Sequence, residues 1–365
     1  MKHKFTWEPL DNIKTLESDW KSLEAISANN FFLSWHWIST WIEFHPDQNS
    51  IYILKLYNKD DVIGLALFTS VHKASKFYTY KSLLLNNTGS ELDHITPEYN
   101  AVLCRPEYRH KINSIVLDIF RYKVKNWDEI QLKRMKNPIN ELSNRNQNVT
   151  PCFSINLADI RQKNTDYLSS LHSNTRYQIR RSERLYEKMF GPISFSIAQD
   201  FDHQIQTLDN LVELHNQYWE NKQKISAFHS EFLIKFHHAL IKKCQSDDSA
   251  YLSTVMAGNS IIGYLYNYNY KKHIYCYQSA FNYQQDNKFK PGYVSHHQMI
   301  EYHLAKGDNV YDFLAGKYRY KQSLATKSNE MYSYVHHSKP LALYIRKIGT
   351  FLNNFKRTYN DDSPE

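Results

Sequence analysis

The chain is poor in glycine, with 9 among 365 residues. Gly-rich loops hold phosphates in dinucleotide-binding and P-loop folds, and a glycine-flanked serine marks the nucleophile of many hydrolases. The sequence contains no G-x-G-x-x-G, no G-x-x-x-x-G-K-[ST] and no G-x-S-x-G motif. These absences argue against a Rossmann dehydrogenase, a P-loop nucleotide hydrolase and a serine hydrolase.

Cysteine is equally scarce, with four residues and no C-x-x-C pair. Structural zinc sites and disulfide frameworks depend on closely spaced or numerous cysteines. The histidine pairs His237-His238 and His296-His297 would point to different faces of a helix, and no H-E-x-x-H motif accompanies them. The pattern predicts reduced thiols and no metal.

Long apolar runs are absent too. No stretch approaches the roughly 20 apolar residues of a spanning helix, and MKHKFTWEPL at the start lacks an apolar run of signal-peptide length. We therefore expect a cytoplasmic protein. The segment LALYIRKIGTFLNNFKR, within residues 341–365, predicts a helix that docks on the second domain or, alternatively, lies peripherally on the inner membrane.

What the chain does have is aromatic and basic residues. Hydrophobic residues make up 42% and aromatics 15%, which indicates a globular protein. Lys and Arg outnumber Asp and Glu by 45 to 37, a net charge of +8. This excess favours anionic partners such as a CoA pyrophosphate, an acidic membrane surface or RNA, without choosing among them.

The length predicts two domains, because a single core rarely grows that large. The polar, Asn-rich stretch 136–149 is the expected boundary. We predict an α+β fold in which each domain has a mixed, mostly antiparallel sheet flanked by helices. The predicted domains cover 1–145 and 146–340, and a helix and tail cover 341–365.

Apolar periodicity predicts the helices and strands of both halves. The predicted helices are 20–44, 108–122, 165–189, 201–219, 230–243 and 292–304. The predicted strands are 50–58, 61–71, 76–85, 98–105, 128–135, 193–198, 249–257, 260–270, 273–281 and 309–315. The segments DDVIGLALF and GNSIIGYLYNYNY resemble one another, which suggests a weak internal repeat.

The segment NKFKPGYVS, residues 287–295, places a Pro-Gly break between a strand and a helix. Free N–H groups at a helix start, with the positive end of the helix dipole, suit a pyrophosphate. Lys288 and Lys290 would add charge. The alternative is that Pro291 and Gly292 only form a turn.

The strand NVYDFLA carries a carboxylate, Asp312, among aromatic residues, and Tyr320 and Lys321 follow it. A carboxylate in such surroundings could act as a general base with a raised pKa. It could equally cap a turn or pair with Lys321.

Three arginines, Arg176, Arg180 and Arg184, recur every four residues and would lie along one helix face. They could bind an anionic acceptor or the 3′-phosphate of CoA through forked hydrogen bonds. Glu183 and Glu187 lie within pairing distance, so an ion-paired surface explains the pattern equally well.

The stretch from Pro291 to Thr326 resembles the C-terminal signature of GNAT acetyltransferases grouped with a cellulose-biosynthesis acetyltransferase. The matching residues are Pro291, Gly292, Gly307, Asp312, Phe313, Gly316, Tyr320 and Lys321. The Arg-rich SNTRYQIRRSERL and an N-terminal pattern also fit the group. That pattern comprises Trp20, Phe32, Ser34, Trp37 and Trp41. A more distant resemblance is to Fem-type peptidyltransferases.

The resemblance implies two tandem GNAT-like domains in a bacterial-type enzyme that transfers an acyl group, most simply acetyl from acetyl-CoA, to an amine or hydroxyl acceptor. We expect direct attack, with Asp312 orienting or deprotonating the acceptor and Tyr293 or Tyr320 protonating the departing sulfur. The donor would be bound by four residues at the start of the helix and by Lys321. The four are Lys290, Gly292, Tyr293 and Val294.

One departure affects the donor. The CoA loop typical of the superfamily, R/Q-x-x-G-x-G/A, is replaced here by N-K-F-K-P-G-Y-V. The Fem-type alternative is aminoacyl transfer from charged tRNA to a cell-envelope precursor, and a third is a non-catalytic binding protein of the same fold.

The acceptor would be selected by cleft loops such as GSELDHITPEY, which carries Glu91, Asp93 and Tyr99. We expect Asp93, with Arg176 and Arg180, to bind the acceptor. The three loop residues could equally be turn residues.

Overall fold

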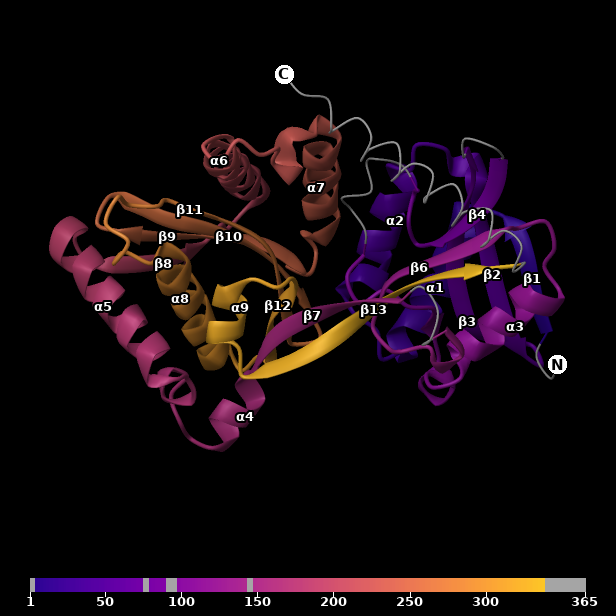
Figure 1. Cartoon of the computed structure of the whole chain (residues 1–365), viewed down its shortest axis with the longest axis horizontal. Helices are drawn as coiled ribbons and strands as arrows, with labels where there is room; N and C mark the ends of the chain where they lie inside the picture. The colour runs from indigo at the N-terminus through magenta and orange to yellow at the C-terminus, as the bar shows by residue number, and fades with distance from the viewer. Residues whose placement is uncertain (1–3, 75–78, 90–96, 143–146, 339–365) are drawn as a thin grey trace, which may run out of the picture. The chain divides into compact units, whose positions relative to one another are not determined.

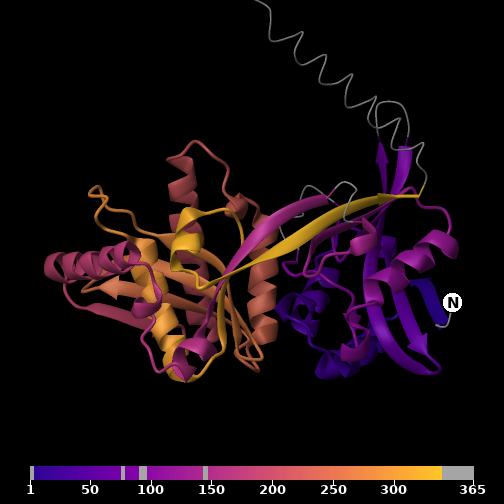
Figure 2. The same cartoon turned by 60° about the horizontal axis from the view of Figure 1, so that its bottom comes forward.

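A computed structural model describes residues 4–74, 79–89, 97–142 and 147–338 (Figures 1 and 2). The chain divides into two compact units. Among the described residues, the first unit runs to Trp35, from His45 to Val149, and from Tyr332 onward. The second unit comprises His36–Phe44 and Thr150–Met331.

The first unit contains the sheet β1-β2-β3-β4-β6-β13, in which β4 and β6 are parallel and the other neighbouring strands antiparallel. Its strands are β1 Lys4–Pro9, β2 Ile51–Asn58, β3 Asp61–Ala74, β4 Thr79–Leu85, β5 Leu103–Cys104, β6 Glu129–Met135 and the end of β13 Lys327–His337. Its helices are α1 Ile13–Ile26 and α3 Ile112–Tyr122. The short strand β5 pairs with β3.

The second unit contains the sheet β7-β12-β11-β10-β9-β8, with β11 and β12 parallel. Its strands are β7 Gln147–Asn156, β8 Ile193–Ile197, β9 Ala250–Ala257, β10 Ser260–Tyr270, β11 His273–Phe281 and β12 Val310–Ala315. Its helices are α2 Trp35–Glu43, α4 Leu157–Gln162, α5 Ser173–Phe190, α6 Phe201–Glu220, α7 Glu231–Cys244, α8 Pro291–Lys306 and α9 Arg319–Leu324.

Strand periodicity assigns the helices of the second unit to the two faces of its sheet. Leu265 of β10 belongs to the same core cluster as Ile300 of α8. Tyr266 points the opposite way and lies against His237 of α7, with ring centroids 5.4 Å apart. Helix α8 therefore covers one face of this sheet and α7 the other.

The resemblance between the two VIG-type strands has a structural counterpart. In β3 the register with β2 skips Ile63, because Tyr57 opposes Val62 and Leu56 opposes Gly64. In β10 the register with β9 skips one residue in the same way, between Ile261 and Gly263. The two units thus share a bulge at the same place in the motif.

Several predicted boundaries are wrong. The predicted helix 20–44 is two helices, because α1 ends at Ile26 and the Asn30 side chain caps a separate 3-10 turn. The predicted strand 98–105 is reduced to Leu103–Cys104. The helix predicted over 165–189 starts at Ser173, and part of the expected linker is strand β7.

The remaining predicted helices and strands are confirmed to within a few residues. The domain boundaries at 145 and 340 stay a prediction, and His36–Phe44 and Tyr332–His337 group with the other unit. The C-terminal helix predicted over 341–365 lies outside the described residues. Over the described residues, no helix is long and apolar enough to cross a bilayer.

Candidate functional site

The central feature of the second unit is a divergence between its two parallel strands. The pairing of β11 with β12 covers three residue pairs and ends at Tyr275 and Asp312. Strand β11 continues to Phe281, whereas β12 turns at Leu314, whose φ is +61°, and meets β7 at Ala315. The backbones of the two strands thus separate beyond Tyr275 and Asp312, and we call this separation the opening.

A β-bulge lies beside this opening. In the pairing of β10 with β11, Tyr266 opposes Gln278 and Asn267 opposes Cys276, so the extra residue is Tyr277. A bulge re-aims the backbone groups of its strand, and bulges are frequent next to active sites. Sequence reasoning missed Tyr277, because nothing in HIYCYQSAF distinguishes a bulged strand from a regular one.

Helix α8 begins close to the end of β11. The ring of Phe281 would lie 3.2 Å from a Cβ at Gly292, so the helix start approaches the strand as closely as it does because that residue is glycine. Pro291 occupies the first turn, and no side chain caps the helix at Lys290. The Lys290 N–H donates to Ser182 Oγ of α5 over 2.8 Å, which fixes the approach to the helix.

Of the predicted donor-binding residues, Lys290, Gly292 and Tyr293 lie together at this helix start and are each half-buried. Val294 is fully buried in the core, so only its backbone could contact a ligand. The N–H of Val294 donates to Lys290 O over 3.1 Å, and Pro291 has no N–H, so the amides at the helix start that could meet a ligand are those of Gly292 and Tyr293.

Asp312 lies at the apex of the opening and is 2% exposed. Its Oδ2 lies 3.0 Å from His273 Nε2, and its Oδ1 accepts the Leu314 N–H over 2.8 Å. The ring of His273 stacks on Tyr275, with centroids 4.1 Å apart, and its side chain is 32% exposed. The carboxylate therefore orients an imidazole that solvent can reach.

Tyr320 and Lys321 lie in α9, the helix that follows β12 in the chain. Tyr320 stacks on the buried His296 at 5.6 Å, and burial raises the pKa of its phenol. Burial and the nearby charge of Lys321 lower the pKa of His296 to about 3, so this imidazole is neutral at pH 7. The ammonium of Lys321 donates to Phe313 O over 2.6 Å and to Ala315 O over 2.7 Å.

The three arginines do follow one another along α5, as predicted. Arg180 and Arg184 are exposed, and Arg176 is half-buried with Nη1 3.4 Å from Leu168 O. Glu183 lies against His297, with 2.6 Å between Oε1 and Nδ1. Asp93 lies outside the described residues.

The corresponding opening in the first unit is closed by the chain itself. There the parallel pairing of β4 with β6 ends at Leu84 and Gln131. Beyond it, the Asn100 N–H donates to Arg134 O over 2.8 Å, and Asn100 Nδ2 donates to Leu85 O over 3.0 Å. The buried Asn100 thus bridges the two strands of the first unit.

Within the described part of the chain, no cluster of three or more His, Cys, Asp or Glu side chains could hold a metal ion. The four cysteines, all in described segments, are free thiols. Cys276 is buried beside the opening, and burial raises the pKa of its thiol to about 11.

Comparisons with solved structures establish the fold. A crystal structure of FemX matches with a TM-score of 0.56 at 11% identity, over 94% of this chain and 100% of that one. L-PGS from Bacillus licheniformis matches with a TM-score of 0.51 at 10% identity, over 94% and 97%. The C-terminal domain of a putative lysylphosphatidylglycerol synthetase from Agrobacterium fabrum gives 0.51 at 7%, over 92% and 96%.

No curated protein matches the sequence. Residues 173–322 match the family model described as the acetyltransferase (GNAT) domain, and this range includes the divergent strand pair and α8. The sheet of the first unit carries a bulge at the same place as the sheet of the second. The chain thus has the predicted fold of two tandem GNAT-like units. The family match covers residues 173–322, which is less than half of the chain.

Proposed function

We propose that the chain transfers an acyl group, most simply acetyl, from acyl-CoA to an amine or hydroxyl acceptor. The observation that carries the proposal is the opening between β11 and β12, with the start of α8 beside it. An extended pantetheine arm could hydrogen-bond to the backbone of β11 beyond Tyr275, where the pairing with β12 has ended, while the pyrophosphate meets the helix amides. The match of this range to the GNAT domain supports it.

In this proposal the acceptor attacks the thioester carbonyl directly. A bond from the acceptor nitrogen or oxygen to the carbonyl carbon forms, the carbon–sulfur bond breaks, and backbone amides near the Tyr277 bulge stabilise the oxyanion. The acceptor proton goes to His273, which Asp312 orients as a positioning residue. Tyr293 or Tyr320 donates its phenol proton to the departing sulfur and regains one from solvent, while His273 releases the acceptor proton to solvent.

Donor binding is tested by calorimetry with acetyl-CoA and with CoA. Lys290→Glu would place a negative charge at the α8 start and is expected to weaken acetyl-CoA binding at least tenfold. Lys327→Glu, an exposed residue of β13, is the control of equal charge change and should bind as the wild type does. Equal affinity of the two variants would refute the donor site.

The role of Asp312 is tested by Asp312→Asn and His273→Gln, with activity followed as CoA thiol release across pH. Both substitutions should lower kcat/KM and shift or flatten its pH profile, because they change the group that accepts the proton. An unchanged rate in Asp312→Asn would remove this assignment. No thiol release by the wild type, together with no binding of acetyl-CoA, would favour the third reading, a non-catalytic binding protein of the same fold.

The alternative is transfer of an aminoacyl group from charged tRNA to a cell-envelope precursor, which the Fem-type resemblance implies. The exposed guanidinium groups of Arg180 and Arg184 favour it, because they could contact phosphates. A strongly salt-dependent affinity for tRNA, lost in Arg180→Glu, together with no affinity for acyl-CoA, would select this alternative. An envelope precursor as acceptor and peripheral membrane contact are part of the proposal in either case, and the likeness to structures of FemX and L-PGS supports the shared fold.

A further inference from the structure

The second unit has an exposed pair of aromatic rings close to the start of α8. Tyr283 lies two residues beyond the end of β11 and is 55% exposed. Its ring stacks on that of Tyr218, in the last turn of α6, with centroids 4.9 Å apart and 28° between the planes. We call Tyr218 and Tyr283 the tyrosine pair. The bond-making steps of the proposed acyl transfer do not involve it.

Neighbouring contacts hold both rings of the pair in place. Two hydrogen bonds tie Asn282, which precedes the second ring, to β10. Its N–H donates to Ile262 O over 2.9 Å, and its Nδ2 donates to Ile261 O over 3.1 Å. On the α6 side, Tyr218 packs edge-on to Trp219, with centroids 5.5 Å apart. The pair is therefore an exposed aromatic surface that is ordered before a ligand arrives, which lowers the entropy cost of binding.

Phe281 connects the tyrosine pair with the start of α8. Its ring lies edge-on to Tyr283, with centroids 6.4 Å apart, and the same ring would lie 3.2 Å from a Cβ at Gly292. Burial raises the pKa of Tyr320 in α9, and charge interactions that include the one with Tyr283 add to this effect. The pair thus lies near both α8 and α9, the two helices that follow the diverging strands.

Lysines lie near the pair. The ammonium of Lys222 is 5.9 Å from the centroid of the Tyr218 ring, and Lys290 is half-buried at the start of α8. The loop before α8 also contains an acid, Asp286, whose Oδ2 is 3.9 Å from Nζ of Lys288. Aromatic rings beside cations are the surface on which a nucleic-acid base with its phosphates binds.

The proposed donor carries such a base at one end. In acyl-CoA the pantetheine arm and the adenosine lie on opposite sides of the pyrophosphate. The proposed function has the arm along β11 beyond Tyr275 and the pyrophosphate at the amides of Gly292 and Tyr293. The adenosine then continues outward from the helix start, and the tyrosine pair is the exposed aromatic surface beside it.

We infer that the adenine ring of the donor stacks on Tyr283, which Tyr218 supports from its other face. The inference rests on the proposed function, because the position of the pyrophosphate decides which end of the donor reaches the pair. It adds a determinant of donor affinity that the acyl-transfer steps do not require. The pair contacts no reacting atom, so it binds the donor and is not catalytic.

The test is calorimetric titration of the full chain with CoA, with ADP and with phosphopantetheine, which lacks the adenosine part of CoA. Tyr283→Ala should weaken the binding of CoA and ADP by about fivefold or more, the low end of what a stacked base contributes. The affinity for phosphopantetheine should not change. Tyr283→Phe keeps the ring and should bind all three probes as the wild type does. With acetyl-CoA as substrate, Tyr283→Ala should raise KM and leave kcat unchanged.

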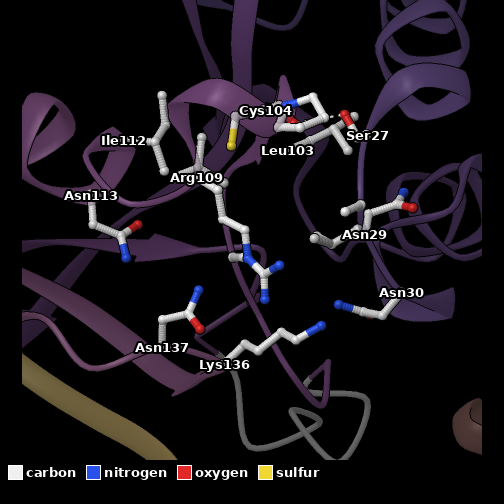
Figure 3. A pocket seen from close by; sticks show the side chains of 15 residues that line it. Ser27, Asn29, Asn30, Leu103, Cys104, Arg109, Ile112, Asn113, Lys136 and Asn137 are labelled. Atoms are coloured by element: carbon white, nitrogen blue, oxygen red, sulfur yellow. Dashed lines mark hydrogen bonds between the residues drawn. The ribbon is translucent and has the colours of Figure 1, made fainter.

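Two variants of the first unit are controls. Tyr122→Ala removes a tyrosine that is 59% exposed and should leave the three affinities unchanged. The guanidinium group of Arg109 reaches into a pocket lined by β5 and the start of α3 (Figure 3), and a guanidinium group suits a phosphate. Unchanged ADP affinity in Arg109→Gln is expected and excludes that pocket as the nucleotide site. Circular dichroism checks that each variant is folded.

The inference is overturned if the wild type binds neither CoA nor ADP, or if Tyr283→Ala binds both as the wild type does. It is also overturned if Tyr283→Ala weakens phosphopantetheine as much as CoA, which would assign the pair to the arm, or if ADP binding is lost in Arg109→Gln. Failure of the proposed function has a different signature. A chain that binds CoA and ADP through Tyr283 but releases no thiol from acetyl-CoA keeps the adenine site and loses the acyl transfer.

Discussion

Lys321 shows how the structure changes the reading of a single residue. The sequence places it beside Tyr320 as a candidate donor ligand, but its buried ammonium donates to Phe313 O and Ala315 O. These carbonyls flank Leu314, where β12 turns with a positive φ. The lysine thus stabilises the turn that opens the strand pair, and a contact with the donor stays a prediction.

We therefore predict that Lys321→Met lowers the free energy of unfolding by about 1–3 kcal/mol, because two buried carbonyls lose their donor. Lys317→Met, an exposed residue of the same segment, should change it by less than about 0.5 kcal/mol. Urea unfolding measures both. If Lys321→Met kept its stability and lost only acetyl-CoA affinity, the donor role would hold instead.

His297 gives a pH-dependent prediction. Burial pushes its pKa down, but hydrogen bonds and the charges of Glu183 and Glu301 outweigh burial and raise the pKa to about 9. The folded-state pKa is above that of the unfolded chain, so the stabilisation is full below about pH 6.5. It is lost as pH rises through 9 and amounts to roughly 3 kcal/mol at most.

The measurement compares urea unfolding of the wild type and His297→Gln at pH 6 and pH 9.5. The wild type should be the more stable at pH 6, and the difference should shrink at pH 9.5. Other titrating groups are common to both chains and cancel in the difference. A gap between the two chains that does not vary with pH would contradict the charged pair.

Residue types allowed part of the candidate site to be singled out from the sequence. Pro291, Gly292 and Asp312 could be singled out because each combines a local conformation or charge with an apolar surrounding. The His273 partner of Asp312 could not, since the two residues are far apart in the sequence and meet only through the parallel pairing of β11 with β12. The bulge at Tyr277 depends on the register with β10, which no local pattern encodes.

At the scale of elements, two glycines with positive φ can be compared, one in the turn between β9 and β10 and the other at the end of α8. Gly258 has a φ of +52°, and a Cβ there would lie 1.9 Å from Phe190 O. Gly307, at the end of α8, has a φ of +85° with nothing within 4 Å of a Cβ. Gly258→Ala should therefore cost at least about 2 kcal/mol more than Gly307→Ala, which costs about 1 kcal/mol.

Thermal and urea unfolding of the two variants check this prediction. Both carry the strain of alanine at positive φ, so the difference between them isolates the clash with the end of α5. Equal destabilisation would mean that α5 moves away from the hairpin without cost.

Elements with strong periodicity and clear turn residues were predicted best. Strands β9, β10 and β11 follow from their β-branched and aromatic residues and from the turns at Gly258 and Lys271. The segment 98–105 has the same apolar character but forms little strand, because Asn100 bonds across the gap between β4 and β6. That gap is a property of the assembled sheet and is invisible in the local sequence.

At the scale of the whole molecule, each unit combines segments that are separated in the sequence. His36–Phe44 comes early in the sequence but belongs to the second unit. Trp37 packs edge-on to Phe236 at 5.3 Å, and Phe44 packs on the same ring at 5.9 Å. The ammonium of Lys243 lies 2.8 Å from Glu43 Oε2. A boundary drawn along the sequence would remove this helix from its unit.

We therefore predict that a polypeptide of residues 150–331 is destabilised, because the surface around Phe236 and Tyr268 loses its cover. Deleting a buried tryptophan alone costs about 3–5 kcal/mol. A synthetic peptide of residues 34–46 should bind this polypeptide and raise its Tm in a concentration-dependent way, since it binds only the folded form. The same peptide with Trp37→Ala should have little effect.

Thermal unfolding followed by circular dichroism measures the shift, and tryptophan fluorescence of the peptide reports its binding directly. If residues 150–331 unfold at the temperature of the full chain, with or without peptide, α2 is not part of the folded unit. If both peptides stabilise equally, the contact between Trp37 and Phe236 is not what holds the helix. Stabilisation by the unmodified peptide alone would show that the second unit needs a helix encoded more than 100 residues before its first strand.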